Sequence, residues 1–441
     1  MKRLTRRNAF LGLVVLAVAA LLAAARARPI GVMELPRPCP APGQAEPAYV
    51  EGQILVKFKP QTGVVVRAAA FVALETRLVR RLSRLDIYLL TVPPGESIDG
   101  FVEIFGRNPD VEYAEPNYLL RASVTPNDTL FQYQYALSNT GQQIGTIPGS
   151  PRGQASADIK ATAGWEETKG SSNVVIAVID TGIDLSHPDL KAKLKSPGRD
   201  FINDDLEADD DNGHGSMVAG IAAAETNNRE GIAGVAWNAR LLPVKALNAT
   251  GVGPSDKVAE AIRWAADNGA GIINLSLGSE TASNTIRDAC KYAFDKGVFI
   301  AAAAGNGGGA VHYPAAYDNT VFAVAATDYN DARADFSNTG PEVDAAAPGV
   351  RILAPYPQAL TPAEYLPYAY GGGTSFATAH VSGLAALIKG LKPGLTPAQI
   401  MHIIRYSADD VNAAQLRGTD EQIGYGRINL EKALVPLILK K

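Results

Sequence analysis

The sequence has 441 residues, of which 46% are hydrophobic and 20% are charged, as in an ordinary soluble globular protein. This length allows two or three domains with a large core. The net charge of −4 gives no reason to expect nucleic-acid binding, so we predict no nucleic-acid partner. Only two cysteines occur, so no framework of disulfides is expected to stabilise the protein.

The first 27 residues have the pattern of a signal peptide. Lys2 and three arginines precede an apolar run from Phe10 to Ala25, which is too short for a comfortable membrane span. Ala25-Arg26-Ala27 is an acceptable cleavage site of the small-x-small type. We therefore expect a secreted, extracellular protein with no stable membrane association once residues 1–27 are removed. An uncleaved membrane anchor is the alternative, and residues 28–48 form a proline-rich leader.

Residues 49–121 predict a small separate domain. Apolar patterns indicate a strand, a helix, two strands, a helix and a strand, at 53–59, 64–75, 78–82, 86–92, 97–105 and 111–114. This β-α-β-β-α-β order is the ferredoxin-like plan, and a unit of this kind can fold alone. In isolation it would be interpreted as a small binding module. Its position between a signal peptide and a larger domain favours a pro-segment.

Residues 124–441 predict a larger α/β domain. Apolar strand candidates lie at 174–179, 239–244, 272–277, 298–303 and 321–325, and helix candidates lie at 216–224, 255–268 and 285–296. Continuous apolar strands separated by helices are typical of a parallel sheet that is covered on both faces. We therefore expect a doubly wound, mostly parallel sheet with helices on both faces.

Two candidate catalytic residues follow early elements of this sheet. Asp180 ends the first apolar strand, where doubly wound sheets gather ligands and catalytic groups. The tripeptide Asp180-Thr181-Gly182 also occurs in aspartic proteases, but those need two such motifs in a β-rich fold, so that interpretation fails. His214 lies where a loop enters a helix, and a lone histidine there is more often a cap or a metal ligand than a base. No second histidine or cysteine lies at metal-ligand spacing, which argues against zinc.

Two further candidates come later in the chain. Asn306 follows the strand 298–303 between two glycines, where it is either a plain turn residue or an amide donor to an oxyanion. Ser375 follows three glycines and a threonine at the start of an apolar helix. Backbone N–H groups in the first turn lack partners and the helix dipole is positive there, which would stabilise an oxyanion formed at Ser375. The alternative is that Thr374 or Ser375 only caps a core helix.

Together the four candidates supply the groups that acyl transfer needs: a hydroxyl nucleophile, an imidazole base, a buried carboxylate and an oxyanion donor. At these residues the sequence resembles the subtilisin-like serine proteases, whose triad runs in the order Asp, His, Ser. The resemblance spans residues 125–433 and is greatest to the thermitase branch, with motifs such as Thr125-Pro126-Asn127-Asp128 and Gly424-Tyr425-Gly426-Arg427. Three positions depart from the family: Ser216 replaces the usual threonine, Phe376 replaces the usual methionine and Ala379 replaces a proline. None of these changes removes a catalytic group.

The resemblance implies a function. The chain would be a serine endopeptidase with polypeptide substrates, made as an autoprocessed zymogen whose residues 49–121 act as an inhibitory pro-domain and intramolecular partner. We expect the processed enzyme to be a monomer with residues 124–441 as its catalytic domain. The alternative, from another functional class, is a catalytically impaired binding protein on the same fold.

The resemblance also implies a substrate-binding surface. An extended substrate should pair as an added strand with Leu275, Ser276, Leu277 and Gly278. The other wall of a roomy apolar P1 pocket would be formed by Ala303, Ala304 and Gly305. His312 lies where the family places the pocket floor, and a surface histidine is the alternative interpretation.

An acidic loop suggests bound calcium. The run from Asp200 to Asp211 packs seven carboxylates into twelve residues, which repel one another unless a cation neutralises them. Hard oxygen ligands suit calcium better than zinc, although a solvated acidic loop is the alternative. By the resemblance, structural Ca²⁺ is expected at two sites and no organic cofactor is expected. The implied side-chain ligands are Asp200, Asn203, Asp205 and Asp209 at one site, and Asp128, Asp189 and Asn228 at the other.

Overall fold

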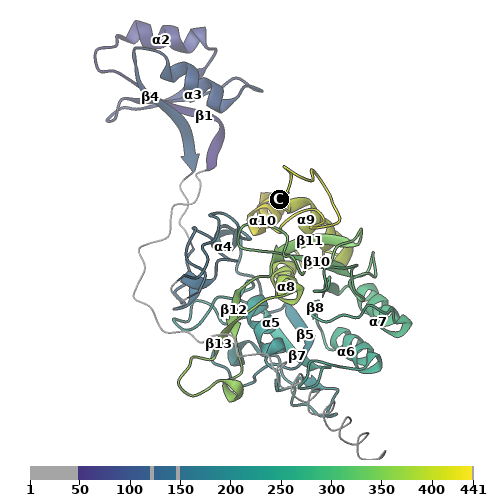
Figure 1. The fold of residues 1–441 in the computed structure, drawn as a ribbon. Helices are drawn as coiled ribbons and strands as arrows, with labels where there is room; N and C mark the ends of the chain where they lie inside the picture. Colours follow the sequence, from purple (N-terminus) through teal and green to yellow (C-terminus); the bar gives the residue numbers. More distant parts are fainter. Residues whose placement is uncertain (1–47, 120–123, 146–148, 440–441) are drawn as a thin grey trace, which may run out of the picture. The chain divides into compact units, whose positions relative to one another are not determined.

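The computed structural model describes residues 48–119, 124–145 and 149–439 of the chain. The predicted signal peptide and the leader up to residue 47 lie outside these residues. The chain divides into two compact units, one spanning Cys39–Ser123 and the other containing Val124–Lys441. Each unit is described by itself (Figure 1).

The smaller unit is an antiparallel four-stranded sheet with two helices. Its strand order is β2-β3-β1-β4, and its core gathers apolar side chains such as Ile54, Phe58, Leu90 and Phe105. This arrangement confirms the ferredoxin-like plan. The elements are β1 (Ala48–Phe58), α2 (Val64–Ala73), β2 (Arg77–Leu82), β3 (Ile87–Thr91), α3 (Ile98–Gly106) and β4 (Val111–Leu119).

The larger unit is built on a seven-stranded sheet in the order β11-β10-β9-β8-β5-β7-β6, with every neighbouring pair parallel. The strands are β5 (Val175–Asp180), β6 (Arg199–Asp200), β7 (Arg240–Lys245), β8 (Ile272–Leu275), β9 (Phe299–Ala303), β10 (Phe322–Thr327) and β11 (Val343–Pro348). An antiparallel hairpin of β12 (Ile352–Pro355) and β13 (Tyr368–Gly371) forms a separate two-stranded sheet.

Helices cover both faces of this sheet, as predicted. Successive strand residues alternate between two cores: Ile176 and Val178 belong to one, while Ala177 and Ile179 belong to the other. The first core includes residues of α4 (Ala161–Glu167), α5 (His214–Ala223), α8 (Thr374–Leu391), α9 (Pro397–Ser407) and α10 (Leu430–Leu439). The second includes residues of α6 (Ser255–Asp267) and α7 (Asn284–Asp295), and short 3₁₀ turns lie at Phe131–Tyr133, Lys191–Lys193 and Gln358–Leu360. None of the described helices is both long and apolar enough to cross a membrane.

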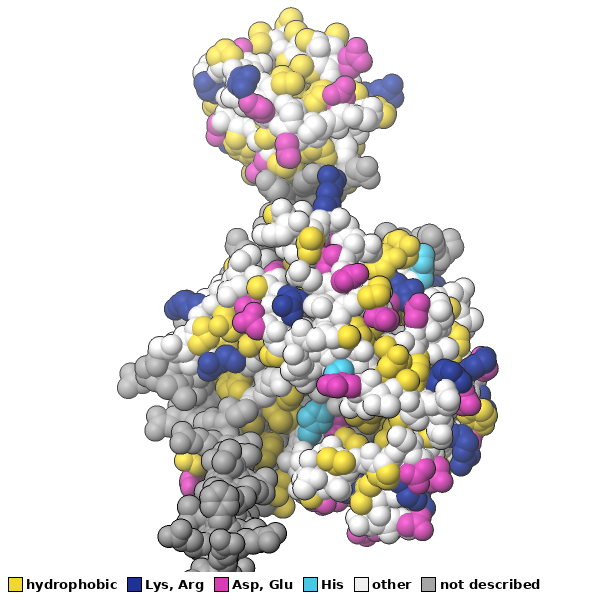
Figure 2. Space-filling view, turned by 45° about the vertical axis from the view of Figure 1, so that its right-hand side comes forward, with side chains coloured by type: hydrophobic (Ala, Val, Ile, Leu, Met, Phe, Trp, Pro, Cys, Tyr) yellow, Lys and Arg dark blue, Asp and Glu magenta, His cyan; other side chains and the backbone are white. Residues whose placement is uncertain are grey.

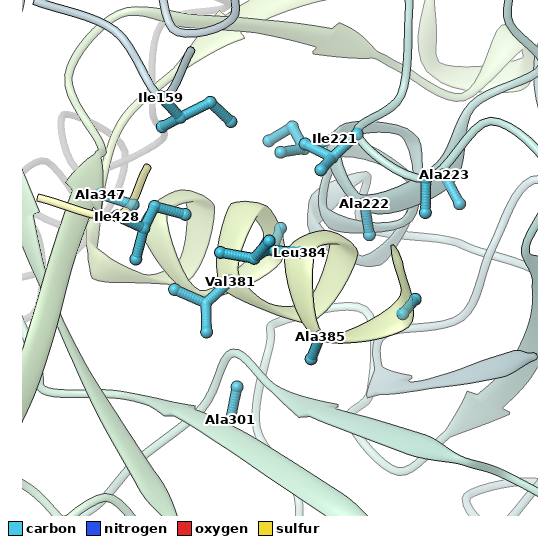
Figure 3. Packing of buried hydrophobic residues seen from close by; sticks show 14 of the residues in the cluster. Ile159, Ile221, Ala222, Ala223, Ala301, Ala347, Val381, Leu384, Ala385 and Ile428 are labelled. Atoms are coloured by element: carbon cyan, nitrogen blue, oxygen red, sulfur yellow. The ribbon is translucent and has the colours of Figure 1, made fainter. Parts of the chain in front are cut away.

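Helix α8 runs through the first core. Every residue from Thr374 to Ile388 is buried, and the helix packs against both the sheet and α5 (Figure 3). Close packing needs a small residue at Gly383, because a Cβ atom there would lie 2.5 Å from Cβ of Val235. The buried helix is therefore held rigidly, and so is Ser375, its second residue.

Candidate active site

The candidate residues meet at the carboxyl end of the parallel sheet. Asp180 ends β5, whose two neighbours are β7 and β8, so the strand order changes direction there. Asn306 follows β9, and His214 and Ser375 lie in the first turns of α5 and α8. In doubly wound folds this change of direction opens a crevice outside the strand ends, where ligands bind.

Asp180 and His214 are in direct contact. Nδ1 of His214 lies 2.7 Å from Oδ1 of Asp180, which also accepts the N–H of Thr181 at 2.7 Å. Asp180 is fully buried, and its Oδ2 has no hydrogen-bond partner among the described residues. The larger unit exposes histidine side chains (cyan in Figure 2), and the side chain of His214 is 29% exposed. A carboxylate at Nδ1 fixes the imidazole so that Nε2 is free to accept a proton.

The carboxylate also changes the basicity of the imidazole. Burial lowers the pKa of His214, but the charge of Asp180 and its hydrogen bond raise that pKa by more, with a further contribution from Asp210. The net pKa is therefore raised above the ordinary value for histidine. A raised pKa makes His214 a better base near neutral pH.

Asp210 holds this pair together, and the sequence analysis missed it. It is buried, and its carboxylate accepts five hydrogen bonds at the start of α5. The donors are the hydroxyl of Thr181, the N–H groups of Asn212 and Gly213, and both the N–H and the hydroxyl of Ser216. One carboxylate thus ties the turn after Asp180 to the helix that carries His214. The only sign of Asp210 in the sequence is weak: it is a carboxylate three residues before Gly213, the residue that precedes the first residue of α5.

Ser216 keeps the hydroxyl that the usual threonine would supply. Its Oγ donates to Asp210 at 2.7 Å and accepts the N–H of Asp184 at 2.8 Å. Beside it, Gly215 allows the helix to approach the turn after Asp180, because a Cβ atom at Gly215 would clash with the carbonyl oxygen of Gly182. The change from threonine to serine therefore removes a methyl group and leaves these hydrogen bonds in place.

A buried lysine supports the same turn. Lys245 ends β7 directly beside Asp180, and its side chain is 2% exposed. Nζ of Lys245 donates to the carbonyl oxygen of Thr181 at 2.5 Å and to Asp211 at 2.6 Å. The buried ammonium therefore has both a carbonyl and a carboxylate partner, as a buried charge requires.

Ser375 lies in the first turn of α8. Gly373 precedes the helix with φ of +148°, and no side chain caps the helix start, so neither Thr374 nor Ser375 is the capping residue that the alternative interpretation required. The hydroxyl of Ser375 donates to the carbonyl oxygen of Ser276 at 3.2 Å, and within the described chain it forms no hydrogen bond with His214. Catalytic hydrogen bonds are often long in ligand-free sites and shorten when substrate binds.

Asn306 is oriented by the residue before the serine. Its Oδ1 accepts both the N–H of Thr374 at 2.8 Å and the Thr374 hydroxyl at 2.9 Å. These two bonds fix the amide plane, and Nδ2 has no hydrogen-bond partner in the part of the chain that the structure describes. A Cβ atom at Gly373 would lie 3.2 Å from this Nδ2. A free amide donor is therefore held beside the first turn of α8.

A cleft of about 440 Å³ runs past His214. Its lining includes Ser276 to Ser279, and the apolar residues in the lining include Leu247, Val252, Val258 and Ile286. The ring of Phe376 packs edge-on against the His214 imidazole with 6.1 Å between centroids and 88° between planes. An aromatic ring at this position fills space beside the imidazole and limits its movement.

The predicted substrate-binding residues are divided between core and cleft. The side chain of Leu275 is fully buried in the second core, and the Ser276 hydroxyl donates to the carbonyl oxygen of Ser375 at 2.9 Å. Leu277 and Gly278 line the cleft beyond the end of β8, which is shorter than the predicted strand 272–277. Ala303, Ala304 and Gly305 are buried at the end of β9, and His312 packs against Gly278 and Gly305.

One set of predicted calcium ligands comes together near the start of the larger unit. Asn228 donates to Asp189 at 2.9 Å, and the pKa of Asp189 is raised to about 6 by burial, with the charge of Asp128 adding to the shift. Burial also raises the pKa of Asp128, whose carboxylate accepts the N–H of Asn227. The two carboxylates are thus partly desolvated and lie within range of each other's charge.

The other set belongs to one loop but is mostly exposed. Asp200 is buried and accepts a hydrogen bond from the side chain of Asn203 at 2.8 Å, while Asn203, Asp205 and Asp209 are exposed. Backbone bonds pair Asp200 with Asp205, and Asp209 accepts the N–H of Leu185 at 3.1 Å. No group of three or more His, Cys, Asp or Glu side chains suited to a metal ion occurs among residues 48–119, 124–145 and 149–439.

Comparisons with known proteins agree with this fold. A protease from Pseudoalteromonas arctica PAMC 21717 has a solved structure that matches with a TM-score of 0.61 and 31% identity, covering 71% of this chain and 99% of that one. Sphericase matches with a TM-score of 0.54 and 35% identity, covering 59% and 92% of the two chains. The larger unit therefore has the subtilisin-like α/β fold of a serine protease.

Sequence comparisons define the family. Residues 171–426 match the model of the subtilase family, and residues 38–117 match that of the fervidolysin N-terminal prodomain. A thermophilic serine proteinase of Bacillus sp. (strain AK1) is 42% identical over 389 residues, which cover 88% of each chain. Thermitase of Thermoactinomyces vulgaris is 42% identical over 277 residues, which cover 63% of this chain and 93% of that relative. The chain belongs to the subtilase family of serine proteases and carries an N-terminal prodomain.

Proposed function

We propose that this subtilase is a secreted endopeptidase whose catalytic residues are Asp180, His214, Ser375 and Asn306. The observation that carries the proposal is the 2.7 Å contact between Asp180 and His214, together with a serine and a free amide at the start of α8. These groups occupy the crevice at the carboxyl end of the sheet. A catalytically impaired binding protein would have no need of a buried, unshared carboxylate oxygen beside an imidazole.

The reaction proceeds by acyl transfer. Oγ of Ser375 attacks the scissile carbonyl carbon, and Nε2 of His214 accepts the hydroxyl proton while Asp180 stabilises the imidazolium. The oxyanion accepts hydrogen bonds from Nδ2 of Asn306 and from the N–H of Ser375 in the first turn of α8. His214 then protonates the leaving amine, and water repeats the sequence of steps to release the acid.

The polypeptide substrate lies extended along the cleft. The backbone of Leu275–Gly278 pairs with it as an added strand, and the apolar side chains of the cleft accept its side chains. Ala303–Gly305 form the opposite wall beside the residue that precedes the cleaved bond. Hydrolysis of an internally quenched peptide tests this function: processed enzyme should cleave it and Ser375→Ala should not, whereas binding without cleavage by the parent would favour the binding-protein alternative.

The prodomain acts as an intramolecular inhibitor until it is removed. Export through the N-terminal signal delivers the zymogen, and cleavage falls between Leu119 and Pro126, at the junction of the two units. N-terminal sequencing of secreted protein identifies the site. Ser375→Ala should remain unprocessed, whereas a processed alanine variant would show that another protease removes the prodomain.

Calcium stabilises the larger unit at two sites. The donor set at Asp128, Asp189 and Asn228 fits a hard cation, because two partly desolvated carboxylates lie within range of each other's charge. Asp200, Asn203, Asp205 and Asp209 would hold the second ion with backbone carbonyls of the same loop. That loop leads directly to α5, so an ion there would help to fix the position of His214.

A further inference from the structure

Asn306 is carried by a loop of very small residues. The loop runs from Gly305 to Ala310, and four of its six residues are glycine. Residues 306–310 are exposed, and φ is +109° at Gly305 and +66° at Gly308. Glycine loses more conformational freedom on folding than any other residue, so such a loop keeps one conformation only where other groups fix it. The position of the Asn306 amide therefore depends on what holds this loop.

The side chain of Asn338 binds the backbone of the loop. Its Oδ1 accepts the N–H of Gly307 at 2.9 Å and the N–H of Gly309 at 3.0 Å, and its Nδ2 donates to the carbonyl oxygen of Ala310 at 2.7 Å. Asn338 is fully buried, so its amide relies on these partners rather than on water. One side chain thus fixes three of the four residues that follow Asn306.

Asn338 also contacts the residue before Asn306. The N–H of Asn338 donates to the carbonyl oxygen of Gly305 at 3.0 Å. A Cβ atom at Gly305 would lie 2.3 Å from Nδ2 of Asn338, so only glycine allows the amide to approach this closely. Asn338 therefore touches both residues that flank Asn306, namely Gly305 and Gly307.

Asn338 is itself tied to the sheet. The N–H of Ala326 in β10 donates to the hydroxyl of the buried Ser337 at 3.0 Å. The N–H of Ser337 donates to the carbonyl oxygen of Ala334 at 2.8 Å, and the N–H of Ala334 donates to that of Ala326 at 2.9 Å. A short, hydrogen-bonded segment therefore connects β10 to Asn338.

We propose that Asn338 is a positioning residue for the oxyanion donor: it fixes the loop 305–310 so that Nδ2 of Asn306 is held where the oxyanion forms beside Ser375. This inference rests on the proposed role of Asn306. Thr374 orients the amide through Oδ1 of Asn306, and Asn338 sets the position of the backbone that carries it. A donor fixed in this way stabilises the transition state without reorganising when charge develops.

Loss of Asn338 should affect kcat more than KM. Asn338→Ala would free the glycine-rich loop, and a displacement of about 1 Å in a catalytic group can lower the rate by about 10²-fold. The substrate backbone is proposed to pair with Leu275–Gly278, which is a different segment. Binding of the ground state should therefore change little.

A double-mutant cycle tests the proposal on processed enzyme made from the full-length chain, with active sites counted by an organophosphonate. In Asn338→Ala, kcat should fall by about 10- to 100-fold with little change in KM. In the Asn306→Ala background the same substitution should change kcat by no more than about twofold, because the donor that Asn338 positions is absent. Asn338→Ser is a smaller change, and the same cycle applies to it where the alanine variant fails to fold.

Asn139→Ala is the matched control. Asn139 is also buried and also binds three backbone groups: its Nδ2 donates to the carbonyls of Ala157 and Tyr329, and its Oδ1 accepts the N–H of Gly141. The loss of these bonds should lower the stability of the fold and leave kcat per active site unchanged.

A kcat within about twofold of the parent in the Asn338 variant would overturn the proposal. An equal fold-loss in the two backgrounds would overturn it as well, because a general structural role acts whether or not Asn306 is present. Failure of the proposed function gives a different result: Asn306→Ala alone would then leave kcat unchanged, or the parent would cleave no peptide.

Discussion

Oδ1 of Asp180 lies 2.7 Å from Nδ1 of His214. Asp210 accepts hydrogen bonds from Thr181, the residue after Asp180, and from Ser216 on α5, the helix that carries His214. The strand end and the helix start are thereby joined through a single carboxylate. A contact fixed in this way needs little reorganisation when the imidazole becomes charged. The expected effects of changing each group follow from this arrangement.

The pH dependence of the rate should report His214. Burial lowers the pKa of His214, but Asp180 raises it by more, so the pKa lies above the ordinary histidine value of about 6.5. The neutral imidazole that acts as base is lost as the pH falls through this raised pKa. We expect kcat/KM to fall on the acidic side of that value. In Asp180→Asn the acidic limb should move to lower pH and kcat should fall by about 10⁴, the loss known for the corresponding change in another serine protease fold. Steady-state assays of the parent and of Asp180→Asn across about pH 5 to 8 measure the acidic limb and kcat. A rate that does not change with pH in the parent would contradict the role of His214 as the base.

Asn306 should act on the transition state. Asn306→Ala removes the free amide donor, and we expect kcat to fall by about 10²–10³ with little change in KM, as is known for loss of the oxyanion-binding asparagine in subtilisin. Asn306→Asp is a second variant: it keeps an oxygen that accepts from Thr374 but replaces the donor by a negative charge, so its kcat should fall at least as far. Steady-state kinetics on one peptide decide the question. A rise in KM at constant kcat would instead assign Asn306 to substrate binding.

Asp210 should matter for both stability and rate. Asp210→Asn replaces one acceptor oxygen by an NH₂ group among five donors, so we expect a loss of about 1–3 kcal/mol in the free energy of unfolding. The rate should fall as well, because the start of α5 carries His214. Asp295→Asn is the control: Asp295 is exposed and pairs with Lys291, so its loss should cost about 0–1 kcal/mol. Denaturant unfolding in the Ser375→Ala background measures the free energy of unfolding of both variants. Equal losses of stability in Asp210→Asn and Asp295→Asn would refute the stabilising role of Asp210.

Removal of calcium should lower the melting temperature of Ser375→Ala. At a concentration of ~100 times Kd, a bound ion stabilises the folded state by about 2.7 kcal/mol, which thermal unfolding in calcium and in excess EGTA would detect. Asp189→Asn and Asp209→Asn each remove one proposed ligand and should each reduce the difference between the two buffers. Identical melting temperatures in both buffers would leave a solvated acidic loop as the better interpretation.

The sheet could be predicted where its strands are apolar throughout. The strand predicted at 239–244 is β7 (Arg240–Lys245), and the helix predicted at 285–296 is α7 (Asn284–Asp295). Strand β11 was missed because Asp344 interrupts it; that carboxyl is buried against Arg405, and burial raises its pKa to about 6. Periodicity alone cannot anticipate a charge that a distant helix neutralises.

The candidate site was predicted less evenly. Residues at strand ends, such as Asp180, have a clear local signal, because an apolar run stops at a polar group. The signal of Asp210 is too weak to separate it from six neighbouring carboxylates, and only the fold distinguishes it as the acceptor for five donors. The position of His312 likewise depends on Gly278 and Gly305, which meet only when β8 and β9 lie side by side.

Covalent labelling of the processed enzyme tests the central claim most directly. An organophosphonate should form one adduct, located by peptide mass spectrometry on Oγ of Ser375, and peptide hydrolysis should be lost in proportion to labelling. His214→Ala should label far more slowly, because the imidazole that removes the hydroxyl proton is absent. A processed protein that hydrolyses peptides without any adduct at Ser375, or that carries the adduct on another residue, would contradict the account.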